Sequence, residues 1–276
     1  MKKVRVAING LGRVGRAFLK LASEREEIEL VVVNDLGDLE NLAYLLKYDS
    51  AYGKWGTDIK TSPGKININN KVIAVSQEKD PLRLPWRVNN IEVVVESTGV
   101  FETYEQARAH LTAGAHKVVI SAPAKDEPPV GVPGGTVLMG INEDKLATCQ
   151  ITSNASCTTN SASPLIKILH EKLGIEKAIL NTVHGYTASQ KLVDSPEAKD
   201  FRRGRAAAAN IVPSTTGAAV AVTKVMPELS GKFDGLAIRV PVLTGSLVDI
   251  TFISKKRTSV EEVNKILKEA AAMPRW

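Results

Sequence analysis

Short apolar strands alternate with amphipathic helices through the first half of the chain. Apolar runs of strand length lie at residues 3–8, 28–33, 91–96 and 117–120. Segments with one apolar helical face lie at residues 17–22, 38–47 and 103–113. Residues 65–75 form a predicted hairpin that turns at Asn69-Asn70. Because apolar strands separated by helices are buried on both faces, the pattern predicts an α/β fold with a doubly wound, mostly parallel sheet.

The pattern changes near residue 150, which predicts a first domain of residues 1–151 and a second of residues 152–276. In the second domain, apolar residues at positions 162, 165, 166, 169 and 173 mark one face of a helix. Strands are expected at residues 177–183, 237–241 and 246–253, and a last amphipathic helix at 259–272. We therefore expect two domains, each with its own sheet.

Composition places the chain among ordinary globular proteins. It has 276 residues, of which 43% are hydrophobic and 24% charged, and a net charge of +6. The Lys and Arg are spread along the sequence, so the charge suits small anionic ligands better than a nucleic-acid surface. No run approaches the ~18 apolar residues of a membrane helix. Cys149 and Cys157 form neither a zinc pattern nor a disulfide framework, which predicts no metal site and a reducing, cytoplasmic setting.

A glycine-rich turn joins the first strand to the first helix. Gly10, Gly12 and Gly15 form the pattern G-x-G-x-x-G, which lets the backbone approach a pyrophosphate that the helix N-terminus attracts. Asp35 ends the second strand, 20 residues beyond Gly15, where an acid that binds a ribose hydroxyl is expected. Because an acid there repels a 2′-phosphate, the pattern predicts a dinucleotide site that favours NAD over NADP. Lys79 lies in a loop and is either a contact to the adenosine half or a solvated lysine.

Residues 154–160 (Asn-Ala-Ser-Cys-Thr-Thr-Asn) place a cysteine at the start of the predicted helix in the second domain. Ser156 is the predicted N-cap, which puts Cys157 in the first turn, where unpaired N–H groups and the helix dipole favour a thiolate. His184 closes the next strand, and a Cys–His pair would activate the thiol, although a lone histidine after a strand is more often structural. His170 lies about 20 Å along the helix from Cys157 and is a poor competitor.

Two further segments carry features of anion sites. The long polar loop at residues 188–210 contains Arg202, Arg203 and Arg205, which suggests phosphate capture as well as simple solvation. Residues 213–219 place hydroxyl groups at a predicted helix start. Arg239 stands in an otherwise apolar strand, where a buried arginine needs an anionic partner. The other histidines, His110 and His116, flank a helix end and are predicted to be structural or exposed to solvent.

With these motifs in place, the chain closely resembles the phosphorylating glyceraldehyde-3-phosphate dehydrogenases. Residues 155–160 (Ala-Ser-Cys-Thr-Thr-Asn) match that family's highly specific signature. Further motifs agree in order and spacing over essentially the whole chain, at residues 9–16, 48–50, 96–101, 120–123, 216–219 and 239–241. The resemblance implies a Rossmann NAD-binding domain followed by an α+β catalytic domain with a mixed or antiparallel sheet.

The resemblance also implies a role for each matched residue. Cys157 is implied as the nucleophile and His184 as its base. The residues implied to bind NAD are Gly10, Gly12, Arg13, Val14, Asp35, Lys79 and Ser121. The residues implied to bind the substrate's phosphate group and the attacking inorganic phosphate are Ser156, Thr158, Thr187, Arg202, Thr216, Gly217 and Arg239.

These roles imply NAD-dependent oxidation of D-glyceraldehyde 3-phosphate, with inorganic phosphate, to 1,3-bisphosphoglycerate in glycolysis. The reaction would pass through a thiohemiacetal and a thioester on Cys157. A homotetramer is expected, with no membrane or nucleic-acid partner. Two alternatives stay open: a dehydrogenase of erythrose 4-phosphate, and a shortened NAD-binding chain with little or no activity.

Two features depart from the family pattern. Residues 124–136 form an expanded, proline-rich loop, which we expect to be a surface insertion. Family members continue beyond the position of Trp276 with further strands, an asparagine that contacts the nicotinamide amide, and a last helix. We therefore expect a shortened copy, or one whose remainder another chain supplies. A sheet edge and apolar surface should then be exposed.

Overall fold

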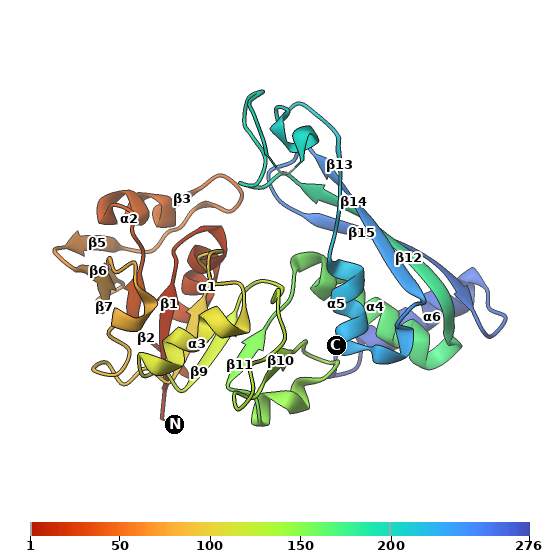
Figure 1. The fold of residues 1–276 in the computed structure, drawn as a ribbon, viewed down its shortest axis with the longest axis horizontal. Coiled ribbons are helices and arrows are strands. Elements are labelled where there is room, and N and C mark those ends of the chain that lie inside the picture. Colours follow the sequence, from red (N-terminus) through yellow and green to blue (C-terminus); the bar gives the residue numbers. More distant parts are fainter. Residues whose placement is uncertain (1, 199) are drawn as a thin grey trace. The chain divides into compact units, whose positions relative to one another are not determined.

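The chain forms two compact units within residues 2–198 and 200–276, which the computed structural model describes (Figure 1). The first unit comprises Met1–Thr136 and Asp144–Asn154, and the second comprises Val137–Glu143 and Ala155–Trp276. The predicted boundary between residues 151 and 152 stays a prediction. The division into units follows packing contacts, and residues 137–143 belong to the second unit whereas residues 144–154 belong to the first.

The first unit alternates strands and helices. Its helices are α1 (Arg13–Ser23), α2 (Leu39–Lys47) and α3 (Tyr104–Thr112), with short 3₁₀ turns at Pro81–Arg83 and Glu143–Ala147. Its strands are β1 (Val4–Asn9), β2 (Ile28–Asn34), β3 (Tyr48–Asp49), β4 (Gly53–Lys54), β5 (Ile59–Ser62), β6 (Lys65–Ile68), β7 (Lys71–Ser76), β8 (Val93–Glu96), β9 (Lys117–Ile120), β10 (Gly134–Thr136) and β11 (Ile151–Ser153). The N-cap side chains Asp38 and Thr103 accept from backbone N–H groups and fix the starts of α2 and α3.

Among the described residues, nine strands of the first unit form one sheet in the order β10-β11-β9-β8-β1-β2-β7-β6-β5, and β3 pairs with β4 in a separate two-stranded sheet. Neighbours from β10 through β7 are parallel, and β7, β6 and β5 are antiparallel. The β6–β7 hairpin turns at Asn69 and Asn70, whose φ angles of 49° and 64° suit a tight two-residue turn. The predicted α/β fold class with a mostly parallel sheet is confirmed.

Both faces of this sheet are covered. Ala7 and Val32 belong to one hydrophobic cluster, whereas the next residues along the same strands, Ile8 and Val33, belong to another. Because successive strand residues point to opposite faces, the two clusters lie on opposite sides of the sheet. This double burial explains why the central strands are continuous apolar runs in the sequence.

The second unit packs helices against one face of a smaller sheet. Its helices are α4 (Cys157–Leu173), α5 (Ala218–Val225) and α6 (Val260–Ala271), with 3₁₀ turns at Phe201–Gly204 and Pro227–Leu229. Its strands are β12 (Ile175–Gly185), β13 (Val212–Ser214), β14 (Phe233–Val240) and β15 (Ser246–Ser254). Among the described residues the sheet order is β13-β14-β12-β15, with β12 and β14 parallel and the other pairs antiparallel. The mixed sheet implied by the family resemblance is therefore present.

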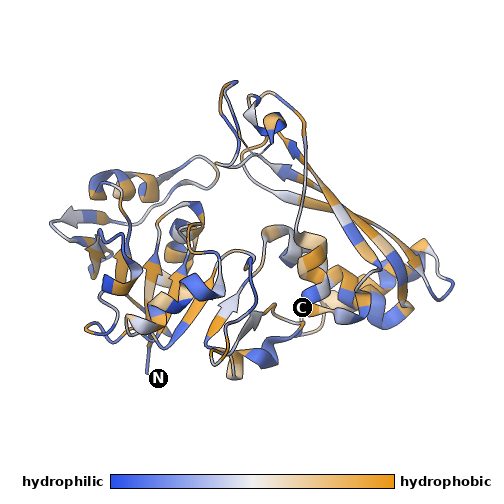
Figure 2. Ribbon diagram, viewed as in Figure 1, coloured by the Kyte–Doolittle hydropathy of each residue, from blue (hydrophilic) through white to orange (hydrophobic). Residues whose placement is uncertain are grey.

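The helices cover only one face of the second sheet. Leu180 of β12 and Phe233 of β14 pack with α4 and α5 residues in one hydrophobic cluster. Along β15, half-buried and exposed residues alternate strictly. Figure 2 shows the matching alternation of hydrophobic and hydrophilic positions along the long strands of this sheet. Nowhere in the described residues is a helix both long and apolar enough to pass through a membrane.

The helix expected to start within residues 213–219 is present and begins at Ala218, with Gly217 as its N-cap. The first residues of that segment belong to strand β13, in which Ser214 pairs opposite Ala237 of β14. One local expectation needs correcting. The loop at 124–136 ends in strand β10, which extends the first sheet by pairing with β11.

Candidate active site

Cys157 is the first residue of α4, as predicted. Ser156 is the N-cap, and its Oγ accepts a hydrogen bond from the backbone N–H of Thr159 at 3.0 Å. Ala155, directly before it, has φ 55°, in the left-handed region that non-glycine residues rarely adopt. This sharp turn leaves Cys157 exposed at the positive end of a 17-residue helix.

His184 supplies the partner of Cys157. It lies one residue before the end of β12, with its Nε2 3.1 Å from Cys157 Sγ. Its Nδ1 is 2.6 Å from the carbonyl oxygen of Gly185. Nε2 faces the sulfur and is therefore the nitrogen that can exchange a proton with it, and a proton on Nδ1 would be donated to the Gly185 carbonyl oxygen. The structure therefore brings together the two residues predicted as nucleophile and base.

The pair lowers the pKa of the Cys157 thiol to about 7. The hydrogen bond from His184 is the main cause, and burial around the sulfur acts in the opposite direction. The charge of His184 and hydrogen bonds from Thr158 lower the pKa further. With a pKa near 7, roughly half of the thiol is ionised at neutral pH, compared with a few per cent for an ordinary cysteine.

Arg239 stands beside this pair on the neighbouring strand. It pairs with His184 in the β12–β14 register and donates from Nη1 to the Gly185 carbonyl oxygen at 3.1 Å. The same Nη1 is 2.5 Å from His184 Nδ1. Arginine only donates, so Gly185 O accepts from Nη1, and the contact between Nη1 and Nδ1 is a hydrogen bond in the tautomer whose Nδ1 carries no proton. Burial lowers the pKa of Arg239, as does the charge of Arg203, and the Cys157 thiolate raises it. A half-buried cation thus lies at the reactive sulfur.

The other predicted phosphate ligands divide into two groups. Thr158 is buried, and its hydroxyl is 2.9 Å from that of Ser246, which in turn contacts Thr182. Thr216 accepts from the backbone N–H of Ala218, and Gly217, the N-cap of α5, has open space where a side chain would be. The start of α5 therefore keeps backbone N–H groups available to an anion.

Thr187 and Arg202 lie on the segment after β12. The Thr187 hydroxyl is 2.8 Å from that of Ser189. Arg202 is exposed and forms a two-point ion pair with Asp200, at 2.9 and 3.0 Å. That pair raises the pKa of Arg202 and lowers that of Asp200. Arg202 would have to leave Asp200 to bind a phosphate, so its predicted role stays a prediction.

Arg203 has no specific role among the sequence predictions, and the structure places it near Arg239. Its Nη2 donates to Ser214 Oγ at 2.6 Å, and its charge lowers the pKa of Arg239. Ser214 is opposite Ala237, two residues from Arg239 along β14. The strand pairing of β13 with β14 brings these residues together, and no local pattern in the sequence indicates that pairing.

The predicted cofactor residues gather at the carboxyl ends of the parallel strands in the first unit. Gly10 has φ 96°, and a Cβ there would lie 2.7 Å from the backbone nitrogen of Thr98. A Cβ on Gly15 would lie 2.0 Å from the Gly10 carbonyl oxygen. Gly12, the N-cap of α1, makes no side-chain hydrogen bond to the helix, so no N-cap side chain stands between this helix end and an anion. This is a cradle that only glycines allow and that suits a pyrophosphate.

The remaining predicted cofactor residues surround this turn to different degrees. Asp35 accepts from the backbone N–H groups of Leu11 and Gly37 at 2.7 and 2.8 Å, which holds its carboxylate beside the turn. Val14 and Ser121 line a common cavity of about 200 Å³. Arg13 is exposed next to Gly12, and Lys79 is exposed after the end of β7. The donor set, with one acid for a ribose and helix N–H groups for phosphates, fits NAD.

Comparisons with known proteins match both units. The model for the glyceraldehyde 3-phosphate dehydrogenase NAD binding domain matches residues 4–104, and the model for the C-terminal domain of the same enzyme matches residues 156–274. The glyceraldehyde-3-phosphate dehydrogenase of Shimwellia blattae is 48% identical over 268 residues, which cover 97% of this chain and 79% of that protein.

Two further relatives give similar values. The protein of the same name from Klebsiella pneumoniae is 48% identical over 96% of this chain and 85% of its own length. The cytosolic glyceraldehyde-3-phosphate dehydrogenase of Gracilaria gracilis is 47% identical over 96% of this chain and 78% of its own length. Similarity at this level extends through both units.

Proposed function

Because the chain belongs to the glyceraldehyde-3-phosphate dehydrogenase family, we propose that it oxidises D-glyceraldehyde 3-phosphate, with inorganic phosphate, to 1,3-bisphosphoglycerate in glycolysis. The cofactor is NAD, as the match of the first unit to the family's NAD-binding domain indicates. The observation that carries the proposal is the 3.1 Å contact between Cys157 and His184, which lowers the pKa of the thiol to about 7.

The first step uses the thiolate of Cys157. Sulfur attacks the aldehyde carbon and forms a C–S bond, while the carbonyl oxygen takes the negative charge. The N-terminus of α4 offers backbone N–H groups to this oxygen, and His184 Nε2–H can give it a proton. The product is a thiohemiacetal on Cys157, with His184 neutral.

The second step needs a base. His184 Nε2 takes back the hydroxyl proton of the thiohemiacetal, and its Nδ1–H bond to Gly185 O keeps the ring in position. Bound NAD supplies the acceptor for the hydride that leaves the same carbon. The residues proposed to hold it are Gly10, Gly12, Arg13, Val14, Asp35, Lys79 and Ser121. A thioester on Cys157 remains.

The last step breaks the thioester. An oxygen of inorganic phosphate attacks the acyl carbon, the C–S bond breaks, and the thiolate pairs again with protonated His184. Arg239 lies beside this sulfur and is the cation proposed to orient phosphate. The residues proposed to bind the two phosphate groups with it are Ser156, Thr158, Thr187, Arg202, Thr216 and Gly217.

A steady-state assay tests the proposal. Purified protein with NAD and inorganic phosphate should form NADH from D-glyceraldehyde 3-phosphate faster than from erythrose 4-phosphate. Cys157→Ser should abolish this formation while NAD still binds. Phosphate-dependent NADH production by Cys157→Ser above a trace would contradict the assigned nucleophile.

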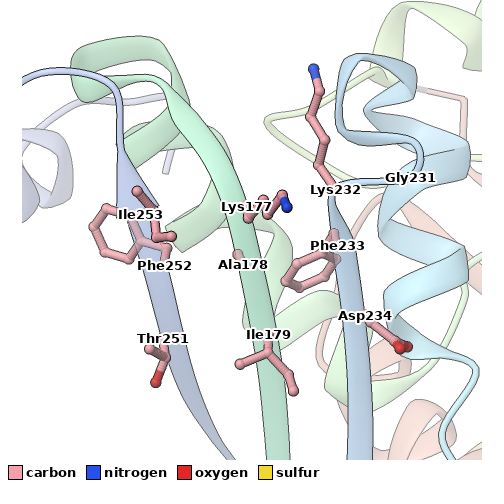
Figure 3. A pocket seen from close by; sticks show the side chains of 10 residues that line it. All are labelled: Lys177, Ala178, Ile179, Gly231, Lys232, Phe233, Asp234, Thr251, Phe252 and Ile253. Carbon is pink, nitrogen blue, oxygen red and sulfur yellow. The ribbon is translucent and has the colours of Figure 1, made fainter.

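The outer face of the second sheet supports the further proposal that copies of this chain assemble as a homotetramer. Ile179, Leu236, Leu247 and Ile253 are 44–64% exposed on the adjacent strands β12, β14 and β15. Figure 3 shows part of this face, where Ile179, Thr251 and Ile253 lie beside a hollow of about 580 Å³. An exposed apolar face of this kind suits self-association about a two-fold axis.

Light scattering coupled to gel filtration tests the assembly. Leu247→Lys should produce smaller species, whereas Leu82→Lys, at an equally exposed position of the first unit, should not. An unchanged mass in Leu247→Lys would contradict this interface.

We propose a cytoplasmic location, which the reducing setting expected for a reactive thiolate supports.

A further inference from the structure

A continuous chain of buried hydrogen bonds crosses the first unit below the carboxyl ends of its parallel strands. Its members are 0–5% exposed and comprise Trp86, His110, Glu96, Asn9 and Asn34. Glu96, Asn9 and Asn34 are the last residues of β8, β1 and β2, three neighbouring strands. None of the five is among the residues proposed above to touch NAD.

The direction of every hydrogen bond in this chain is fixed. Trp86 Nε1 is 3.0 Å from His110 Nδ1, and an indole N–H only donates. His110 Nδ1 therefore accepts, so its proton is on Nε2, which donates to Glu96 Oε2 at 2.9 Å. Asn9 Nδ2 donates to the same oxygen at 2.6 Å. Asn34 Nδ2 donates to Asn9 Oδ1 at 2.8 Å, which fixes the orientation of both amides.

Glu96 is the centre of the chain. Among the described residues four groups donate to it, since Thr98 adds its backbone N–H, at 2.8 Å, and its hydroxyl to the donors on His110 and Asn9. Both carboxylate oxygens are used as acceptors, so hydrogen bonds fix the orientation of the group on both sides. An amide in its place would turn an NH₂ group toward at least one N–H that cannot change its role, on Asn9 or on the Thr98 backbone.

The chain supports three pieces of the cofactor site. The Thr98 backbone that Glu96 holds is the surface against which Gly10 packs, 2.7 Å from where a Cβ would be. Ser97 Oγ donates to the Gly10 carbonyl oxygen at 2.7 Å and closes the same contact. At the far end, Asn34 precedes Asp35 and accepts from Ser76 Oγ and the Glu78 backbone N–H. Hydrogen bonds and packing thus connect the Gly10 turn, the Thr98 turn and Asp35 to the carboxylate of Glu96.

We infer that Glu96 is the positioning residue of the cofactor site, with His110 and Trp86 holding it in the required orientation. Glu96 acts through Thr98 and Asn9, which set the spacing between the Gly10 turn and the end of β2. The inference rests on the proposed function only in that NAD is the ligand of this turn. The inference adds one requirement. The residues of this hydrogen-bonded chain must keep matching donors and acceptors, and burial alone is not sufficient for NAD binding.

Calorimetric titration of NAD into folded protein tests the inference without any turnover. Glu96→Gln should weaken NAD binding by about tenfold or more, because a buried mismatch of donors displaces the Thr98 or Asn9 anchor. Trp86→Phe should weaken it by about two- to fivefold. In the double variant both changes act on the same hydrogen-bonded chain, so the second removes a support for an anchor that the first has already displaced. The double loss should therefore be smaller than the product of the two single losses.

Ile66→Ala is the matched control. Ile66 is as deeply buried in the same unit but lies on β6, away from the chain, so the variant should lower the melting temperature and change the NAD Kd by less than about twofold. Wild-type affinity in Glu96→Gln, equal NAD weakening in Ile66→Ala, or a fully multiplicative double variant would each overturn the inference. If Glu96→Gln does not fold, Trp86→Phe takes its place in the test, and a wild-type NAD affinity in Trp86→Phe would overturn the inference. Absence of NAD binding in the wild-type protein would instead overturn the proposed function.

Discussion

Two histidines in this molecule have opposite roles because of what their ring nitrogens contact. His184 Nδ1 faces the Gly185 carbonyl oxygen and Arg239 Nη1, and its Nε2 faces the Cys157 sulfur, with which it can exchange a proton. His110 Nδ1 faces the indole N–H of Trp86, so Nε2 must hold its proton toward Glu96. The first ring lies at an exposed sulfur and the second is fully buried. A single hydrogen-bond partner thus separates a base from a structural support.

The largest effect should come from removing the nucleophile at the exposed site. Cys157→Ala removes the only sulfur in contact with His184 among the described residues and should lower kcat by roughly 10⁴-fold or more. Steady-state NADH formation measures the loss. Cys149→Ala, at the buried second cysteine, is the control and should retain activity.

Removing the base should have the next largest effect. His184→Gln should lower kcat/KM by roughly 10²–10⁴-fold, the range for a lost general base. His110→Gln, the same change at the buried ring, should lower it far less when both proteins are assayed in their folded state. Equal losses of kcat/KM in His184→Gln and His110→Gln would contradict the claim that only His184 acts as a base.

The cation beside the sulfur should matter less than the base. Arg239→Leu should raise the KM for inorganic phosphate by roughly 10–100-fold, because it removes a charge-assisted hydrogen bond. Arg205→Leu is the control, since Arg205 is exposed and paired with Asp194. If both variants kept the wild-type KM for phosphate, Arg239 would not be a phosphate ligand.

The smallest effect on chemistry, but a clear one on stability, should come from the buried ring. His110→Leu leaves Trp86 Nε1 without its acceptor and Glu96 with one donor fewer, which should cost about 1–3 kcal/mol per unsatisfied group in unfolding free energy. Urea denaturation measures this loss. The rate at which Cys157 reacts with an alkylating reagent should stay at the wild-type value.

Local signals in the sequence predicted those parts of the site that depend on neighbouring residues. Ser156 as N-cap, Cys157 in the first helical turn and the Asn69-Asn70 hairpin are all set within a few residues. The alternation of apolar strands and helices predicted the mostly parallel sheet for the same reason. His184 next to Cys157 needed a non-local contact, and its prediction rested on the strand end and then on the family resemblance.

The features that the sequence concealed depend on strand pairing and burial. Pairing with β14 makes Val212–Ser214 a strand just before the predicted helix start and carries Arg203 toward Arg239. The sequence predicts only that His110 is structural or exposed, because no local pattern connects it with Trp86 and Glu96. The three meet only when β8 and α3 pack together. The one hint was a Glu at the end of an apolar strand, which must find donors when buried.

The pH dependence of Cys157 alkylation tests the central claim most directly. Cys149 is buried, so the fast reaction with iodoacetamide reports the exposed thiol. Since the pKa of Cys157 is lowered to about 7, the rate should rise with pH through a midpoint near 7. In His184→Gln the midpoint should move up toward the ordinary value of about 8.5. The same midpoint in both proteins would contradict the account, because the thiolate would then owe nothing to His184.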